Sequence, residues 1–180
     1  IAALQTVSTP DVAHNLAAAA RLIGQAARDG ARLAALPEYF CLMGRRDDDK
    51  LAIAEAPGQG PIQAFLGAQA RAHGLWLIGG TLPLATATPG RVRNACCVYA
   101  PDGTLAARYD KIHLFRYDNG RENYDEARVL EAGSDAVTLQ AGPLRVGLSV
   151  CYDLRFPELY RRLCTPPCDL LRVPAAFPYT

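Results

Sequence analysis

The sequence predicts an α/β fold with a mixed sheet, because short apolar runs alternate with amphipathic helical segments along its first half. Apolar residues recur with helical spacing after Pro10 and again after Pro61, and short apolar runs separate the two segments. Beyond residue 90 the pattern changes to strand-like runs joined by turn residues such as Pro101-Asp102-Gly103, which is typical of hairpins.

The first expected element is a buried strand over residues 1–7, which leads into a helix. Thr9 has the hydroxyl side chain of an N-cap, and Pro10 has the fixed φ that suits the first helical position. That helix should end near Gly30. The other expected elements are strands over 33–36, 75–82, 137–139, 144–150 and 169–173, a hairpin over 95–109, and helices over 61–74 and 157–163.

Composition is typical of a globular domain and excludes several functional classes. The chain has 180 residues, of which 50% are hydrophobic, and its formal net charge is +1. Without a clustered basic face, a nucleic-acid surface is not expected, and no apolar run has the length of a transmembrane helix. Adjacent Cys96 and Cys97 would face opposite sides of a strand, so reduced thiols in a cytoplasmic protein are expected rather than disulfides.

Three residues stand at the edges of apolar runs and are candidates for catalysis: Glu38, Lys111 and Cys151. A thiol that enters a helix meets free backbone N–H groups and the positive end of the helix dipole, and both favour a thiolate. A carboxylate among apolar residues suits a general base, and an inward-pointing ammonium stabilises developing negative charge. Each residue also has an ordinary interpretation, as a buried core thiol, a solvated glutamate or a surface lysine.

Other motifs are weaker. Gly147-Leu148-Ser149-Val150-Cys151 half-matches the G-x-S-x-G elbow of serine hydrolases, but a cysteine replaces the closing glycine. Cys164 and Cys168 could begin a zinc or redox site, although no second Cys/His pair of suitable spacing follows. His113 lies close to Lys111 and is a candidate supporting residue.

Three segments together resemble the nitrilase superfamily of carbon–nitrogen hydrolases, in the family's order and across essentially the whole chain. They are Leu36–Phe40, Tyr109–Phe115 and Cys151–Leu159, and Pro174–Phe177 looks like a further family segment. The resemblance implies a four-layer α-β-β-α sandwich with a Glu–Lys–Cys triad that works without metal or organic cofactor.

The resemblance also implies roles for individual residues. Glu38 would take the proton of Cys151, and the thiolate would attack an amide carbonyl. Lys111 and the backbone N–H of Tyr152 would bind the oxyanion. Ammonia would leave, and water activated by Glu38 would hydrolyse the resulting thioester.

The family often has a second glutamate between the lysine and cysteine segments. Glu126 is the best match, and Glu122 is the alternative. Asp153 and Arg155 are expected to form a structural ion pair near the nucleophile.

The segment Asn119–Glu126 looks most like the deaminated-glutathione amidase branch. The resemblance therefore implies hydrolysis of a small carboxylate-bearing amide, of the deaminated glutathione or α-keto acid amide type. Close alternatives are an ω-amidase and an N-carbamoyl amino acid amidohydrolase. The expected partners are the substrate and further copies of the chain, in a homodimer or a higher homo-oligomer.

The chain departs from the family pattern in three places. It stops at Thr180 without a terminal helix, so we expect one hydrolase domain over residues 1–180 that is incomplete at its C-terminus. An open sheet of this kind leaves a non-catalytic binding or assembly module as an alternative. Two prolines between Cys164 and Cys168 replace a stretch that is usually helical. Arg172 interrupts an aliphatic run, and a buried guanidinium needs a partner or an exposed edge.

Overall fold

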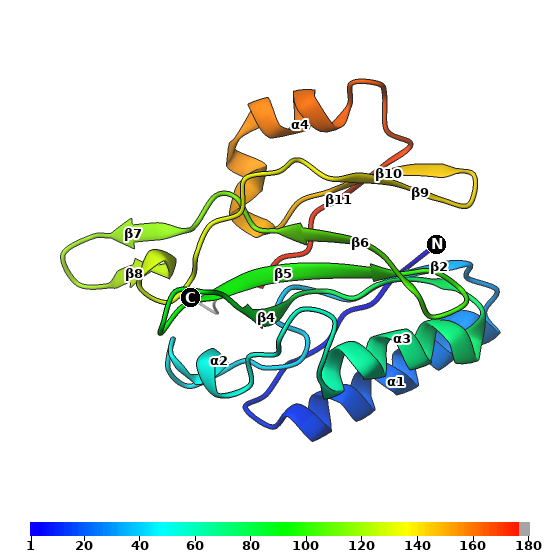
Figure 1. The fold of residues 1–180 in the computed structure, drawn as a ribbon, viewed down its shortest axis with the longest axis horizontal. Coiled ribbons are helices and arrows are strands. Elements are labelled where there is room, and N and C mark those ends of the chain that lie inside the picture. The colour runs from blue at the N-terminus through cyan, green and yellow to red at the C-terminus, as the bar shows by residue number, and fades with distance from the viewer. Residues whose placement is uncertain (177–180) are drawn as a thin grey trace.

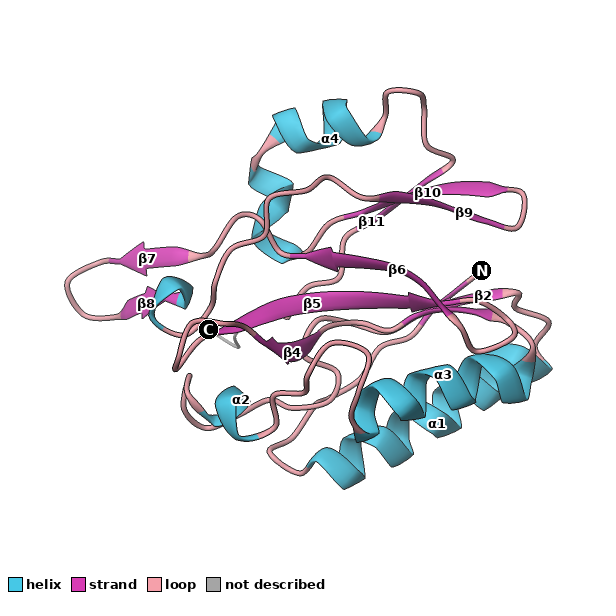
Figure 2. Ribbon diagram, viewed as in Figure 1, coloured by secondary structure: helices cyan, strands magenta, loops and turns pink. Residues whose placement is uncertain are grey.

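The computed structural model describes residues 1–176 and shows four layers in the order helix, sheet, sheet, helix (Figure 1). Helices α1 (Val12–Arg28) and α3 (Pro61–His73) form one outer layer. Helix α4 (Pro157–Leu163) forms the other, and two sheets lie between them (Figure 2). The predicted α-β-β-α sandwich is confirmed. Phe177, at the end of the last expected family segment, lies outside the described residues.

The larger sheet has six strands and mixed directions. Strands β1, β2 and β3 are parallel, whereas β5 pairs antiparallel with β3, β4 and β6. The predicted hairpin over 95–109 is therefore confirmed as β5 and β6. The six strands are β1 (Ala2–Ala3), β2 (Leu33–Ala35), β3 (Trp76–Ile78), β4 (Leu82–Ala85), β5 (Val92–Tyr99) and β6 (Leu105–Asp110).

The smaller sheet has three strands, with β10 at its centre. These strands are β9 (Thr138–Ala141), β10 (Leu144–Leu148) and β11 (Leu170–Arg172). Strand β10 is antiparallel to β9 and parallel to β11, and α4 lies in the crossover between β10 and β11. This crossover brings β11 back beside the strand that leads to Cys151.

Residues 110–135 contain short elements. A hairpin of β7 (Arg116–Asp118) and β8 (Asn123–Asp125) projects from the body of the molecule (Figure 1). The 3₁₀ helix η1 (Glu126–Arg128) follows it directly. Two further short helices are α2 (Asp49–Ala52) and the 3₁₀ helix η2 (Cys151–Arg155). Within residues 1–176, no helix combines the length and the apolar character needed to cross a membrane.

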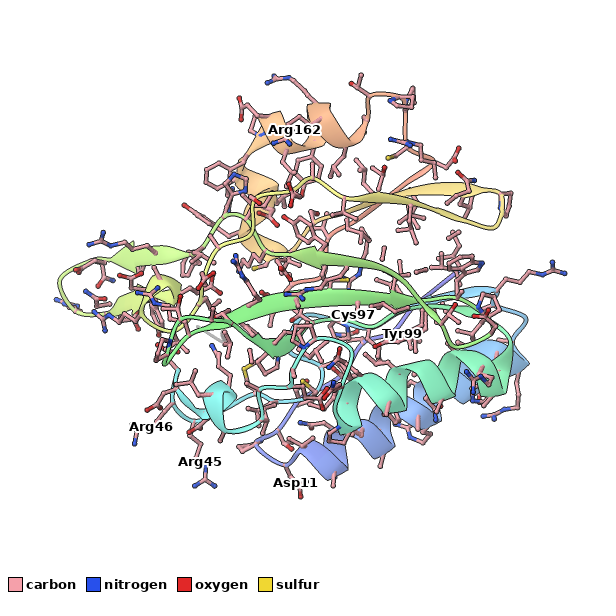
Figure 3. The ribbon with its side chains drawn as sticks, in the orientation of Figure 1. Asp11, Arg45, Arg46, Cys97, Tyr99 and Arg162 are labelled. Atoms are coloured by element: carbon pink, nitrogen blue, oxygen red, sulfur yellow. The ribbon has the colours of Figure 1, made fainter. Side chains whose placement is uncertain are left out.

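Two apolar clusters hold the layers together, and β5 contributes to both because its side chains alternate between faces. Cys97 and Tyr99 pack toward the helices (Figure 3), whereas Cys96 and Val98 pack between the two sheets. The prediction that Cys96 and Cys97 face opposite sides is confirmed. All six cysteines carry free thiols.

The first strand is shorter than predicted. It comprises only Ala2–Ala3, and the side chains of Ile1 and Val7 are 71% and 90% exposed. The reason is that β1 is an edge strand, which pairs with β2 alone. The prediction of a buried strand over residues 1–7 was therefore wrong.

Helix α1 begins later than predicted, with Asp11 and not Thr9 as its N-cap. The Asp11 carboxylate accepts the backbone N–H of His14 at 3.0 Å, which satisfies a donor at the open end of the helix. Thr9 instead fixes the entry to the helix, because its backbone N–H donates to the Asn15 side chain at 2.9 Å.

The strand predicted over 75–82 is interrupted at Gly79-Gly80 and continues as two strands, β3 and β4. Gly80 has a φ of +60°, and a Cβ there would collide with the backbone carbonyl of Pro37 and the ring of Phe40. The backbone of the segment that carries Glu38 therefore packs directly against Gly80, and only glycine permits this approach.

We predict that Gly80→Ala lowers the free energy of unfolding by about 2 kcal/mol or more, because it combines left-handed strain with a backbone clash. Urea denaturation would measure the loss. Gly90→Ala is the matched control, since Gly90 has a φ of +71° but no atom within 4 Å of the position that a Cβ would take. Its cost should be about 1 kcal/mol, and equal losses at the two positions would contradict the proposed contact.

Candidate active site

Glu38, Lys111 and Cys151 meet at the end of the sandwich where β2, β6 and β10 finish. The Nζ atom of Lys111 lies 3.2 Å from Oε1 of Glu38, and the two residues are 1% and 2% exposed. The half-buried thiol of Cys151 lies beside this pair, close enough for the charge of Glu38 to raise its pKa. The structure thus brings together the three candidates that the sequence singles out.

The carboxylate of Glu38 is held on both oxygens. Oε1 accepts hydrogen bonds from Nδ2 of Asn94 at 2.9 Å and from Nζ of Lys111 at 3.2 Å. Oε2 accepts the backbone N–H of Ala176 at 3.0 Å. These three donors leave the carboxylate a single orientation.

Lys111 lies between two carboxylates, because its Nζ is also 2.9 Å from Glu126. Burial disfavours the charged form, but Glu38 and Glu126 outweigh it, so the pKa of Lys111 is raised above its ordinary value. Glu126 also accepts the backbone N–H of Phe115 at 2.7 Å. Of the two candidate second glutamates, Glu126 joins the cluster and Glu122 lies exposed on the hairpin.

The thiol of Cys151 is protonated at rest. Burial and the negative charge of Glu38 raise its pKa to about 12, against the opposing effect of Lys111. The expectation that a helix N-terminus favours a thiolate is therefore wrong here, because η2 is a short 3₁₀ turn whose effect burial outweighs. Cys151 itself has a strained φ of +48°, and its backbone N–H donates to the carbonyl of Pro174 at 2.8 Å.

Tyr152 places a backbone N–H directly after Cys151. Among residues 1–176, no acceptor takes that N–H. The ring of Tyr152 contacts the edges of Phe115 and Phe156, with centroid distances of 5.2 and 5.4 Å. Aromatic packing therefore fixes the position of the turn while leaving its N–H available.

Asp153 organises this turn, a role that sequence reasoning missed. It is fully buried and accepts hydrogen bonds from the hydroxyl of Tyr109 at 2.6 Å and from the backbone N–H of Val150 at 2.8 Å. Its other oxygen lies 2.7 Å from Nδ1 of His113. The side chain of Asp153 thus ties the cysteine turn to the segment that carries Lys111.

The expected ion pair between Asp153 and Arg155 is wrong. Asp153 turns back toward the N-terminus of η2, where it accepts the backbone N–H of Val150, and Arg155 is exposed. His113 takes the place of Arg155 beside Asp153, and its ring stacks on Phe156 at a centroid distance of 3.7 Å. His113 therefore supports the cysteine turn rather than the Glu38–Lys111 pair.

Arg172 is buried between the two sheets, so the alternative of an exposed edge does not apply. Its guanidinium donates to the backbone carbonyl of Leu36 and lies 3.2 Å from the sulfur of Cys96, while its Nε atom has no partner among the described residues. Burial lowers the pKa of Arg172 from its ordinary value. The buried guanidinium therefore has the partner that the sequence analysis expected, and this partner is the carbonyl oxygen of Leu36, two residues before Glu38.

Cys164 and Cys168 are half-buried at and after the end of α4. Within residues 1–176, no group of three or more His, Cys, Asp or Glu side chains could hold a metal ion. The sulfur of Cys168 lies 3.1 Å from the backbone carbonyl oxygen of Leu163, the last residue of α4.

A family model for carbon–nitrogen hydrolases matches residues 1–178. The chain belongs to this family. The resemblance to the nitrilase superfamily of carbon–nitrogen hydrolases is therefore confirmed.

Two curated relatives illustrate the relationship. The chain is 37% identical over 180 residues to a deaminated glutathione amidase of Synechocystis sp., with 98% of this chain and 65% of the relative aligned. It is 38% identical over 168 residues to the human omega-amidase NIT2, with 92% and 59% aligned. The chain thus spans less than two thirds of the length of these relatives.

Solved structures agree with the fold. The C. elegans NitFhit protein superposes with a TM-score of 0.84 at 29% identity, covering 97% of this chain and 43% of that protein. An amidase from Nesterenkonia sp. superposes with a TM-score of 0.82 at 26% identity, covering 97% of this chain and 64% of the amidase. One variant of that amidase carries acrylamide, attached by Michael addition at its active-site cysteine.

We predict that Lys111→Met destabilises the protein by about 3–5 kcal/mol at pH 7, because it leaves the buried carboxylate of Glu38 and the partly buried carboxylate of Glu126 without their cation. The pKa of Lys111 is higher in the folded protein than in the unfolded chain. Lys111 therefore contributes fully to the free energy of unfolding below the unfolded-state pKa of about 10.4, and this contribution is lost as the pH rises through the folded-state pKa. Urea denaturation from pH 6 to 11 would measure the difference from the unmodified protein.

Arg46→Met is the control for this prediction, because Arg46 forms an exposed pair with Asp48 in which its side chain is 76% exposed. Arg46→Met should lower the free energy of unfolding by less than about 1 kcal/mol. A loss of similar size in both variants would show that the buried lysine contributes no more than a surface ion pair.

We also predict that alkylation of Cys151 by iodoacetamide accelerates continuously from pH 8 to pH 11. An ordinary thiol levels off above its pKa of about 8.5, whereas the pKa of Cys151 is about 12. Peptide mass mapping would follow Cys151 separately from the other cysteines, with Cys151→Ala as the blank. A plateau below pH 10 would show that the thiolate already exists at rest.

Proposed function

We propose that this protein is an amidohydrolase that cleaves the C–N bond of a small carboxylate-bearing amide through a thioester on Cys151 and releases ammonia. The observation that carries the proposal is the ion cluster of Glu38, Lys111 and Glu126, with the thiol of Cys151 beside Glu38. A carboxylate, an ammonium and a thiol in contact can supply a base, an oxyanion donor and a nucleophile.

The first step is attack by sulfur on the amide carbonyl. Because the thiol is protonated at rest, Glu38 takes its proton as the S–C bond forms. The carbonyl oxygen becomes an oxyanion, and Nζ of Lys111 and the N–H of Tyr152 donate hydrogen bonds to it. One such donor contributes roughly a hundredfold or more to the rate in other hydrolases.

The second step breaks the C–N bond. The proton held by Glu38 passes to the departing nitrogen, so that ammonia leaves and the acyl group remains on the sulfur of Cys151 as a thioester. Glu38 then removes a proton from water, which attacks the thioester carbonyl. The carboxylic acid departs, and the proton returns to the sulfur as the S–C bond breaks.

The two carboxylates have separate tasks in this mechanism. Glu38 exchanges protons, whereas Glu126 holds Lys111 from the other side at 2.9 Å. Lys111 can therefore remain an ammonium even while Glu38 carries a proton. Glu126 acts as a supporting residue in this proposal.

The substrate class is proposed from the relatives. Similarity to a deaminated glutathione amidase supports an α-keto acid amide of that type. Similarity to omega-amidases supports the closest alternative, and an N-carbamoyl amino acid amidohydrolase would use the same three residues. We also propose one domain over residues 1–180, assembly as a homodimer or higher homo-oligomer, and a cytoplasmic location.

A non-catalytic binding or assembly module is the second candidate function. It is favoured by the edge position of β11, where Leu171 is 39% exposed and Val173, directly after the strand, is 36% exposed. That candidate requires a stable complex with another chain and no acyl adduct. The experiment below separates the two.

We predict that the wild-type protein forms a transient acyl adduct on Cys151 when mixed with a panel of α-keto acid amides, ω-amides and N-carbamoyl amino acids. Intact-protein mass spectrometry would detect the adduct, and ammonia release would report turnover. Cys151→Ala should abolish both, and Glu38→Gln should reduce turnover by about 100-fold or more. Cys164→Ala is the control and should leave both unchanged. Turnover that persists in Cys151→Ala would refute the mechanism.

A further inference from the structure

Asn94 is a buried polar residue in an otherwise apolar row. It lies on β5 with 2% of its surface exposed. Because side chains alternate along a strand, Asn94 shares its face with Cys96 and Val98, which pack in the apolar layer between the two sheets. A carboxamide in this position needs an explanation, since burying polar groups in an apolar layer is unfavourable unless they are hydrogen-bonded.

The side chain of Asn94 has one hydrogen bond among the described residues, and it goes to Glu38. Its Nδ2 donates to Oε1 of Glu38 at 2.9 Å, and its Oδ1 has no partner there. The amide cannot be turned around, because Oδ1 would then face a carboxylate oxygen with no hydrogen between them. The chemistry of the contact therefore fixes the orientation of the amide.

The main chain of Asn94 contacts the second member of the cluster. Its backbone carbonyl accepts the N–H of Lys111 at 3.0 Å, where the ladder between β5 and β6 ends. One residue thus holds the side chain of Glu38 and the backbone of Lys111. Glu38 is 56 positions away in the sequence, so this contact depends on the folded sheet.

The two oxygens of Glu38 are divided between different partners. Oε1 accepts from Asn94 and Lys111, whereas Oε2 accepts the N–H of Ala176. The same N–H also lowers the pKa of Cys151, so it lies near the thiol as well as near Oε2. Oε2 therefore faces the thiol of Cys151, and Oε1 faces Asn94 on strand β5.

We propose that Asn94 is a positioning residue for the amidohydrolase reaction. By holding Oε1 of Glu38 beside Lys111, it keeps Oε2 directed at the proton of Cys151 and, later, at the departing nitrogen and the attacking water. The inference rests on the proposed function, because the reaction is what requires a fixed carboxylate. Asn94 contacts no reacting atom and acts through Glu38.

The first test is the steady-state kinetics of Asn94→Leu in the full chain, with the amides that the wild type hydrolyses. Leucine has a similar size but no donor, so Glu38 can rotate away from Cys151. We expect kcat to fall by about 10- to 100-fold, the scale of a small misplacement of a catalytic group. KM should change by less than about threefold, because Asn94 does not contact the substrate. Asn94→Ser, which is too short to reach Glu38, should show the same loss.

Asn15→Leu is the matched control. Asn15 is 3% exposed, and its amide donates to the backbone carbonyls of Thr9 and Cys41, away from Glu38. We expect it to lower the melting temperature without lowering kcat. A kcat of either Asn94 variant within threefold of the wild type, or an equal loss of kcat in Asn15→Leu, would overturn the positioning role.

A crystal structure of Asn94→Ser separates this inference from the proposed function. The inference expects the Glu38 carboxylate to be rotated, with Oε1 no longer within hydrogen-bonding distance of Lys111. A Glu38 that stays in place would overturn the positioning role even if no amide were hydrolysed. A rotated Glu38 in a protein whose wild type hydrolyses none of the amides would support the positioning role and reject the amidase function.

Discussion

The buried ion cluster around Lys111 is the constraint on which the arrangement of the site depends. The ammonium of Lys111 and the carboxylate of Glu38 are buried and Glu126 is partly buried, and such burial is tolerated only where every charge has partners in good geometry. Glu38 and Glu126 supply the countercharges, while Asn94 and the backbone N–H groups of Phe115 and Ala176 satisfy the remaining oxygens. The strand ends that carry these residues cannot move independently without exposing an unpaired charge.

The same cluster sets the protonation state of Cys151. A carboxylate beside a half-buried thiol keeps the proton on sulfur, so the proposed mechanism begins with transfer of that proton to Glu38 and not with a thiolate already present. Cys151 is itself held in a strained backbone conformation by the turn that Asp153 organises. A strained backbone of this kind persists only where several surrounding contacts hold it in place. Here the hydrogen bonds of Asp153 provide those contacts.

Sequence reasoning succeeded where the signal was local. Gly74 closes α3 and Pro61 opens it, as the helix pattern predicted, and the apolar runs before Glu38 and Cys151 mark the strand ends where these residues emerge. It failed where a distant residue decides the outcome. The break at Gly80 depends on the backbone of Pro37, and the partner of Asp153 is His113, 40 positions earlier. Asn94 was missed because an asparagine within a strand carries no local sign of the carboxylate across the sheet.

The contact between Ala176 and Glu38 links the site to the order in which the chain is synthesised. The two residues are 138 positions apart, so at a translation rate of about 5–20 residues per second Glu38 emerges roughly 7–28 s before its last hydrogen-bond donor. Contacts of such long sequence separation also form slowly during folding. The nascent chain therefore carries Glu38, Lys111 and Cys151 before they share one geometry, and the hydrogen bonds of the cluster are complete only when the segment that follows β11 reaches Glu38.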